Sequence, residues 1–356
     1  MRDAALTALL DAASAGPGLI VLDENQSTGL PPPPSPHWRA LCNRSDVAQA
    51  AQAAGWHCEC NDFDFSATPP LRQGLYRLSK EKRVAEHVLQ ALWDKLEIAG
   101  ELLLSGYKQE GVKTLASRAA AAWGSTAELT RGEGHLHLYR LRKTTETAAR
   151  LTHSDYHALH LIGEWEGLLL WSKHGIFAWD RIDDGSRLLL EHLPSALAHR
   201  HAGQRDAAAL SALDLGCGYG LLALALGKQG IGRVLATDNN AAAVHVTAHN
   251  LAQYALPGSF QVILDDCASS LNERVDLLVC NPPFHQGFAV EGALTDRFLA
   301  AAGRLIKPKG QALFVVNAFI PLERKAAEVF SEVKTLANNR RFKVLHLSQP
   351  RGARTR

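Results

Sequence analysis

Residues 210–227 read LSALDLGCGYGLLALALG, and this stretch decides the fold. Its first six residues form a short apolar run that predicts a buried strand, and its last seven predict the start of a helix. The three glycines between them, Gly216, Gly218 and Gly220, permit positive φ angles and a close approach of a ligand to the backbone. A strand, a glycine turn and a helix in this order predict the cofactor-binding unit of an α/β protein.

The alternation of strand and helix continues from this stretch towards the C-terminus. Regular alternation implies a mostly parallel sheet with helices on both faces. The final apolar run, residues 341–347, is predicted to close this sheet as a partner in an antiparallel edge hairpin. The other predicted strands are residues 233–238, 260–265, 275–280 and 311–317, and the predicted helices are residues 239–252 and 295–305.

The first half of the chain repeats this rhythm more faintly. The segments QALWDKLEIAGELLLSGYKQEG, from Gln90, and RFLAAAGRLIKPKGQALFVVNAF, from Arg297, both run from a helix through a tight glycine turn into a buried strand. This likeness indicates an internal duplication of one α/β unit, and we place the domain boundary near residue 150. In the first half the predicted strands are residues 19–23, 57–65, 101–106 and 135–141, and the predicted helices are residues 46–54, 80–97 and 111–122.

The tetrapeptide Asn281-Pro282-Pro283-Phe284 follows the apolar run VDLLVC, at the strand end where α/β folds place their chemistry. Each proline lacks an N–H group and fixes its own φ, so the turn is rigid. Such a turn can aim the side-chain carbonyl of Asn281 and the backbone carbonyl of Pro282 at one point, with Phe284 beside them as a flat surface. This arrangement suits a planar NH2 group. The first half contains neither this turn nor a glycine cradle, so we expect it to be chemically silent.

Acidic residues around the glycine turn distinguish between two cofactor classes. A dinucleotide fingerprint requires Gly or Ala at the position of Leu221, and the leading acid Asp214 favours a cationic ligand such as the amino-acid end of S-adenosylmethionine. Asp238, at the end of the next strand, is placed to accept from ribose hydroxyls. Asp266 follows the third strand and is predicted to accept from the adenine amine, and a polar loop start is the alternative. S-adenosylmethionine is therefore the predicted cofactor.

Composition and charge narrow the function classes. The six cysteines lack paired C-x-x-C spacing, so neither a disulfide framework nor a zinc site is predicted, and we expect no metal. The scattered cysteines favour a reduced compartment, so we expect a cytoplasmic protein, and no apolar run approaches the roughly 18 residues that a membrane helix needs. Residues 300–356 carry 12 Lys and Arg against 3 Glu, which suits either a polyanion or an ordinary solvated surface. Arg340 and Arg341 belong to this basic block.

The motifs DLGCGYG, NPPFHQG, VVNAFIPL and RFKVLHL occur in this order, after GIF and DGSRLLLEHLP. With Asp238, they make the chain resemble class I S-adenosylmethionine-dependent methyltransferases that methylate planar nitrogen. Among these it most resembles the bacterial ribosomal RNA guanine-N2 methyltransferases of the small subunit. The resemblance is strong from about residue 170 and weak before it.

The resemblance implies transfer of a methyl group to the exocyclic N2 of a guanine in 16S rRNA. It implies two tandem Rossmann-like methyltransferase domains: a degenerate one, residues 1–150, for RNA binding and structural support, and a catalytic one, residues 151–356. The expected partner is ribosomal RNA, in the small subunit or an assembly intermediate, and the expected state is a monomer. The implied catalytic residues are Asn281, Pro282 and Phe284, and the implied substrate contacts are Phe177, Pro283, His285, Arg340 and Arg341.

Three alternatives remain open at the level of the sequence. Guanine-N2 methylation of 23S rRNA uses the same catalytic turn, and protein glutamine methylation uses a closely similar one. A noncatalytic RNA-binding module would use the basic C-terminus alone. The glutamine alternative predicts no RNA requirement, and the binding module predicts RNA affinity without use of the methyl donor.

Overall fold

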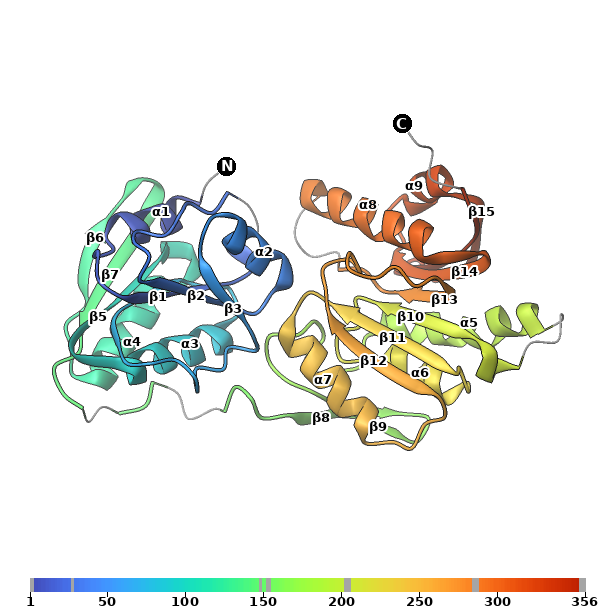
Figure 1. Ribbon diagram of the computed structural model, residues 1–356, viewed down its shortest axis with the longest axis horizontal. Helices are drawn as coiled ribbons and strands as arrows, with labels where there is room; N and C mark the ends of the chain where they lie inside the picture. Colours follow the sequence, from blue (N-terminus) through green and yellow to red (C-terminus); the bar gives the residue numbers. More distant parts are fainter. Residues whose placement is uncertain are drawn as a thin grey trace. The chain divides into compact units, whose positions relative to one another are not determined.

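The computed structural model describes residues 3–26, 29–146, 149–151, 155–201, 206–283 and 288–351. The chain divides into two compact units, Met1–Ala158 and Leu159–Arg356, close to the boundary predicted near residue 150. Each unit contains its own twisted α/β sheet (Figure 1). Among the helices of these described ranges, none combines the length and the apolar character that crossing a membrane requires.

The N-terminal unit holds a seven-stranded sheet, within its described residues, in the order β3-β2-β1-β4-β5-β7-β6. The first five strands of this order are parallel, whereas β7 is antiparallel to both β5 and β6. The strands are β1 (Gly18–Leu22), β2 (Trp38–Cys42), β3 (His57–Cys60), β4 (Leu71–Arg77), β5 (Leu96–Tyr107), β6 (Glu128–Arg131) and β7 (Leu136–Arg142). The helices are α1 (Ala4–Asp11), α2 (Ser45–Ala53), α3 (Lys82–Lys95) and α4 (Val112–Trp123).

The C-terminal unit repeats this topology in the order β12-β11-β10-β13-β14-β16-β15 (Figure 1). Its strands are β10 (Ser211–Leu215), β11 (Arg233–Asp238), β12 (Ser259–Leu264), β13 (Val275–Cys280), β14 (Ile306–Asn317), β15 (Phe330–Asn338) and β16 (Phe342–Pro350). Its helices are α5 (Asp184–His201), α6 (Leu221–Lys228), α7 (Ala241–Ala252), α8 (Phe288–Leu305) and α9 (Leu322–Val329). A separate hairpin, β8 (His160–Trp165) and β9 (Leu168–Ser172), precedes α5.

Strand β10 shows why the C-terminal sheet needs helices on both faces. Successive side chains of a strand point to opposite faces, so a strand buried on both sides must be apolar throughout. Leu213 and Leu215 pack in one buried cluster with Phe298 of α8. Ala212 belongs to the opposite cluster, with Leu222 of α6. The two clusters hold the end of β10, and therefore the glycine turn that follows it, in a fixed position.

The shared strand order confirms the predicted tandem architecture. The strand predicted at residues 341–347 is β16, which is antiparallel to β14 and forms the edge hairpin with β15, as predicted. The outermost strand, β15, was not predicted. The sequence also failed to reveal β2, β4 and β6. β4 reads LRQGLYR, a pattern without clean alternation, and it is a strand because β1 and β5 pair with it on either side.

Candidate active site

The glycine turn and the catalytic turn lie at the same edge of the C-terminal sheet. β10 is hydrogen-bonded between β11 and β13, and all three strands are parallel. Their carboxyl ends therefore meet, which brings together residues 216–220, Asp238 and Asn281. Gly216, Gly218 and Gly220 have φ angles of 79°, 57° and 85°, respectively, as the motif predicted.

Helix α7 packs against the glycine turn, residues 216–220, which we call the glycine cradle. A Cβ atom on Gly220 would lie 2.9 Å from Cγ2 of Thr247, so the close approach of the two elements requires glycine. The Thr247 hydroxyl donates to the carbonyl of Gly218 at 3.0 Å. A Cβ atom on Gly218, by contrast, would meet nothing within 4 Å, so the cradle is open on that side. An open glycine loop with a tightly packed base fits close approach of a cofactor to its backbone.

Asp214 is fully buried beneath the cradle. Its Oδ2 accepts the backbone N–H of Ala223 at 2.9 Å, which ties the start of α6 to β10, while its Oδ1 has no hydrogen-bond partner in the described structure. Burial raises the pKa of this carboxyl to about 8, and the negative charge of Asp238 adds to the shift. A buried carboxyl with an unsatisfied oxygen fits a positively charged ligand above it.

Asp238 holds the cradle from the neighbouring strand. Its Oδ2 accepts the backbone N–H of Gly218 at 3.0 Å, and its Oδ1 accepts the backbone N–H of Asn240 at 2.9 Å. The side-chain amide of Asn240 in turn donates to the carbonyl of Gly175 at 2.8 Å. This bond anchors the GIF loop next to Asp238. Phe177 of that loop is 46% exposed and is therefore not a core residue.

Asp266, which is predicted to contact the adenine amine, is paired with an arginine in this structure. Its carboxylate is buried and forms an ion pair with Arg297 of α8. The adjacent Asp265 accepts hydrogen bonds from Ser269 and Ser270, so its oxygens are occupied within its own loop. The predicted contact of Asp266 with an adenine amine stays a prediction, and it would have to be made beside Arg297.

The catalytic turn is oriented by residues that the sequence did not single out. Nδ2 of Asn281 donates to Oδ2 of Asp183 at 2.8 Å and to Oγ of Ser186 at 2.9 Å. Only the N–H side of an amide can satisfy a carboxylate oxygen, so these bonds decide which way the amide faces. The carbonyl oxygen of Asn281 is left as the acceptor on the other side. Pro282 is buried and Pro283 is exposed, whereas Phe284 and His285 lie outside the described residues.

A chain of hydrogen bonds joins the catalytic turn to the cradle. The backbone N–H of Asp183 donates to the hydroxyl of Tyr219 at 3.1 Å, and the backbone N–H of Ser186 donates to Oδ2 of Asp183 at 2.8 Å. Tyr219 is a cradle residue, and its burial raises the pKa of its phenol, which keeps the hydroxyl neutral. Ser186 lies in DGSRLLLEHLP and Asp183 directly before it. That stretch predicted a turn and a helix and contributed to the family resemblance, but it predicted no contact with Asn281.

The two arginines predicted to touch RNA lie in the turn between β15 and β16. Arg341 forms an ion pair with Asp184 at 2.6 Å, next to the residue that orients Asn281. Both side chains of the pair are more than half exposed, so the pair contributes little to stability. Arg340 is exposed and has a left-handed backbone with φ of 72°. Their role in RNA binding stays a prediction.

Comparison with known proteins identifies the family. The model of the methyltransferase small domain matches residues 167–346, which contain the cradle and the catalytic turn. A ribosomal RNA small subunit methyltransferase C from Chromohalobacter salexigens is 33% identical over 298 residues, covering 84% of each chain. The chain belongs to the ribosomal RNA small subunit methyltransferase family. A second member of the wider group, a ribosomal RNA large subunit methyltransferase G from Shewanella amazonensis, is 31% identical and covers 77% of this chain and 68% of its own length.

The two-unit fold of this methyltransferase also has a solved counterpart. The 16S rRNA N2 methyltransferase of T. thermophilus, solved in complex with AdoMet and guanosine, superimposes with a TM-score of 0.79 at 24% identity. The match covers 98% of this chain and 92% of the other. The tandem arrangement of two α/β units is therefore a feature shared with that structure.

Proposed function

We propose that this methyltransferase transfers a methyl group from S-adenosylmethionine to the exocyclic N2 of a guanine in 16S rRNA. The observation that carries the proposal is the orientation of the Asn281 amide by Asp183 and Ser186. It leaves two rigid carbonyl acceptors, from Asn281 and Pro282, at the strand end beside the glycine cradle. The family membership, and the guanosine bound by the T. thermophilus enzyme, support guanine as the base.

The chemistry follows from the electronic structure of the guanine amine. Its lone pair is delocalised into the ring, so the amine is a weak nucleophile. Two carbonyl oxygens that accept its N–H bonds favour rehybridisation towards sp3 and stabilise the positive charge that develops on nitrogen. The catalytic turn holds the guanine in line for attack on the methyl group. No strong proton acceptor is needed before the attack. Phe284 is proposed to stack on the guanine, which must be unstacked from the RNA to enter.

The methyl donor supplies an electrophilic methyl group when bound. The residues that would hold it are the cradle glycines, with Asp214 beneath its cationic end and Asp238 at its ribose. Asp266 is proposed to meet the adenine amine, and Phe177 to cover the site. The buried unsatisfied oxygen of Asp214 and the open space over Gly218 support this assignment.

The proposal distinguishes between two RNA substrates, the rRNA of the small subunit and that of the large subunit. The small-subunit relative is matched at higher identity, 33% against 31%, and over a larger share of both chains than the large-subunit relative. These relatives disfavour protein glutamine methylation and a noncatalytic module. We further infer a cytoplasmic monomer that requires no metal and acts on the small subunit or an assembly intermediate, with Pro283, His285, Arg340 and Arg341 in contact with the RNA.

The test is to incubate the protein with labelled S-adenosylmethionine and with separate 16S rRNA, 23S rRNA, 30S subunits and 50S subunits. We expect label in 16S rRNA or 30S subunits, at the N2 of one guanine when the modified nucleotide is mapped. Asn281→Ala protein is the control for adventitious activity. Label confined to 23S rRNA, to 50S subunits or to protein would contradict the proposal.

A further inference from the structure

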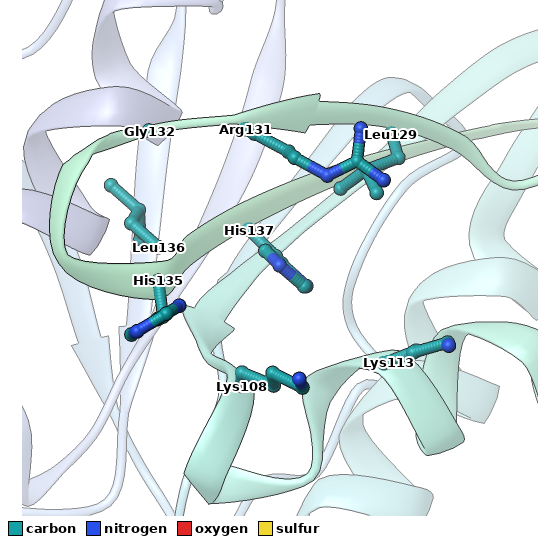
Figure 2. A pocket seen from close by; sticks show the side chains of 8 residues that line it. All are labelled: Lys108, Lys113, Leu129, Arg131, Gly132, His135, Leu136 and His137. Atoms are coloured by element: carbon teal, nitrogen blue, oxygen red, sulfur yellow. The ribbon is translucent and has the colours of Figure 1, made fainter.

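The N-terminal unit contains a cavity of about 300 Å3 at one end of its sheet (Figure 2). It is formed by three elements: the 3-10 turn η2 (Lys108–Glu110), the first turn of α4, and the β6–β7 hairpin. Five of its lining residues are cationic or can become so, and we call these five the basic pocket. They are Lys108, Lys113, Arg131, His135 and His137.

The side chains of the basic pocket line one cavity. Arg131 and His137 face each other directly across β6 and β7, and Figure 2 shows His137 between the hairpin and the two lysines. Burial lowers the pKa of His137, and the positive charges of the four other pocket residues lower it further. These charges therefore act on one small volume.

The positive charge of the pocket is not neutralised within the described structure. The lining of the pocket includes no carboxylate. Among the ion pairs of the described residues, none involves Lys108, Lys113 or Arg131. Two acids lie close to these residues in sequence. Glu110 is committed elsewhere, because both of its carboxylate oxygens accept from the buried guanidinium of Arg77 at 2.9 Å. Glu133, which follows Gly132 in the hairpin, is exposed and does not line the cavity. α4 begins without an acidic residue in its first turn, so its N-terminal dipole adds to the positive potential.

Protection of a sheet edge is the plain alternative, because charged residues on an edge strand discourage aggregation. This explains Arg131, which lies on the edge strand β6. It does not explain why Lys108 and Lys113, from two other elements, line the same cavity. The position of the cavity also points to a ligand.

The basic pocket lies at the edge of the sheet where α/β folds bind ligands. Leu136, at the start of β7, pairs with Tyr107, at the carboxyl end of β5. In the C-terminal unit Phe342 pairs in the same way with Asn317, and the adjoining turn carries Arg340 and Arg341. Each unit therefore has an arginine in the hairpin at the carboxyl edge of its parallel strands: Arg131, at the end of β6, in one unit, and Arg340 with Arg341 in the other.

We propose that the basic pocket binds a backbone phosphate of RNA and so makes the catalytically silent unit an RNA-binding element. A phosphate matches the pocket because it needs cations and donors but no partner for a base or a sugar. None of the lining residues is a Phe, Tyr or Trp on which a base could stack, and none is an acid for ribose hydroxyls. RNA as the source of the phosphate rests on the proposed function.

The test compares two variants of the full chain with equal loss of charge. The pocket variant is Lys108→Gln with Arg131→Gln. The control variant is Lys95→Gln with Arg72→Gln, which removes the same residue types from the opposite edge of the same sheet, where Leu71 pairs with Leu96. Binding of an oligouridine of about 30 nucleotides is measured by fluorescence anisotropy over a range of salt concentrations, and thermal melts confirm that both variants fold.

We expect the pocket variant to bind at least about tenfold more weakly than the parent protein at low salt. Its slope of log affinity against log salt should fall by about 1.4, from two lost contacts to single-stranded RNA. The control variant should keep both values, and inorganic phosphate at low millimolar concentration should not compete. Equal losses in the two variants would overturn the proposal, and so would effective competition by inorganic phosphate, which would identify a small phosphate compound as the ligand. Oligouridine contains no guanine, so failure of the proposed methylation would leave this result unaffected.

Discussion

The two sheets of this protein have the same strand order, yet the loops at their carboxyl ends differ completely. In the C-terminal unit a glycine cradle follows β10 and Asn281-Pro282-Pro283 follows β13. In the N-terminal unit Asp23 follows β1 directly, and Leu78 and Ser79 follow β4. The scaffold is therefore compatible with both an open site and a closed one.

Side-chain hydrogen bonds link the loops at the corresponding strand ends of the N-terminal unit. The buried side-chain carbonyl of Gln26 accepts the backbone N–H of Asp23 at 2.8 Å. The hydroxyl of Ser79 donates to Glu24 at 3.1 Å, which links the loop after β1 to the loop after β4. These bonds occupy the position where the other unit leaves open backbone. The comparison teaches that strand order follows from apolar patterning, whereas chemistry depends on a few loop residues that keep the strand ends open.

When matched residues of the two units are substituted, the largest difference in kcat should appear at the catalytic turn. Asn281→Ala removes one of two preorganised acceptors, and we expect kcat to fall by about 10²–10³ while binding of S-adenosylmethionine is retained. Equilibrium dialysis and a methyl-transfer assay separate the two effects. Ser79→Ala, after the corresponding strand of the N-terminal unit, should leave kcat unchanged. Full activity of Asn281→Ala would remove the proposed mechanism.

A buried carboxyl in each unit should make stability depend on pH. The pKa of Asp214 is raised from 3.8 to about 8, so between these values the unfolded chain loses a proton that the folded chain keeps. Stability therefore falls as pH rises through this window, by roughly 4 kcal/mol at pH 7. Asp214→Asn should flatten this slope in denaturant titrations at pH 5 and pH 8.

Asp23→Asn is the companion variant, because burial also raises the pKa of Asp23 to about 8. Comparable flattening in both variants would show that the shift belongs to the shared fold. Bound S-adenosylmethionine should change the slope of stability against pH only in proteins that keep Asp214. The reason is that the cationic ligand favours the charged form of this carboxyl. No change of slope in Asp214→Asn would contradict the burial argument.

Loss of the hydrogen bonds from Asp183 and Ser186, which orient the Asn281 amide, should lower kcat less than loss of Asn281 itself. Asp183→Ala frees the Asn281 amide to rotate, and we expect kcat to fall about 10- to 100-fold with KM and donor affinity nearly unchanged. Asp183→Asn keeps an acceptor and should recover part of the loss, and Ser186→Ala should cost less than Asp183→Ala. Equal loss of donor binding and kcat in Asp183→Ala would indicate a structural role instead.

The smallest expected effect compares two glycines with the same φ of 85°. A Cβ atom on Gly220 would meet Thr247 at 2.9 Å, whereas one on Gly111, in the silent unit, would meet nothing within 4 Å. Alanine should cost about 1–2 kcal/mol at both sites from the left-handed backbone, with about 1–3 kcal/mol more at Gly220 from overpacking. Chemical denaturation measures the difference, and equal costs would show that the cradle tolerates a larger residue.

The predictable parts of the protein were those that depend on local sequence. The apolar runs predicted every strand of the catalytic sheet except β15, and the glycine pattern predicted the three positive φ angles. β15 reads FSEVKTLAN, whose polar residues lie on an exposed edge, so the pattern of a half-buried strand was weak. β4 was missed for a similar reason, because Arg72, Gln73 and Gly74 interrupt its apolar residues.

The candidate site was predictable only in part. Asn281 and Pro282 stand in a contiguous motif that restricts its own backbone, so their chemistry could be inferred without neighbours. Asp183 and Ser186 lie almost a hundred residues earlier and have no motif that reveals their partner. The basic pocket was missed as well, since its residues come from three separate elements, each of which reads as an ordinary charged surface.

The sequence alone determined the alternation of strands and helices, the glycine turn and the rigid acceptor turn, because each depends on backbone preferences within a few residues. The tertiary structure decided which way the Asn281 amide faces, how Tyr219 and Asp183 connect the cradle to that turn, and where the unneutralised cations of the silent unit gather. These outcomes depend on hydrogen bonds and charges between segments distant in the chain. Such contacts arise only when the sheet brings its strand ends together.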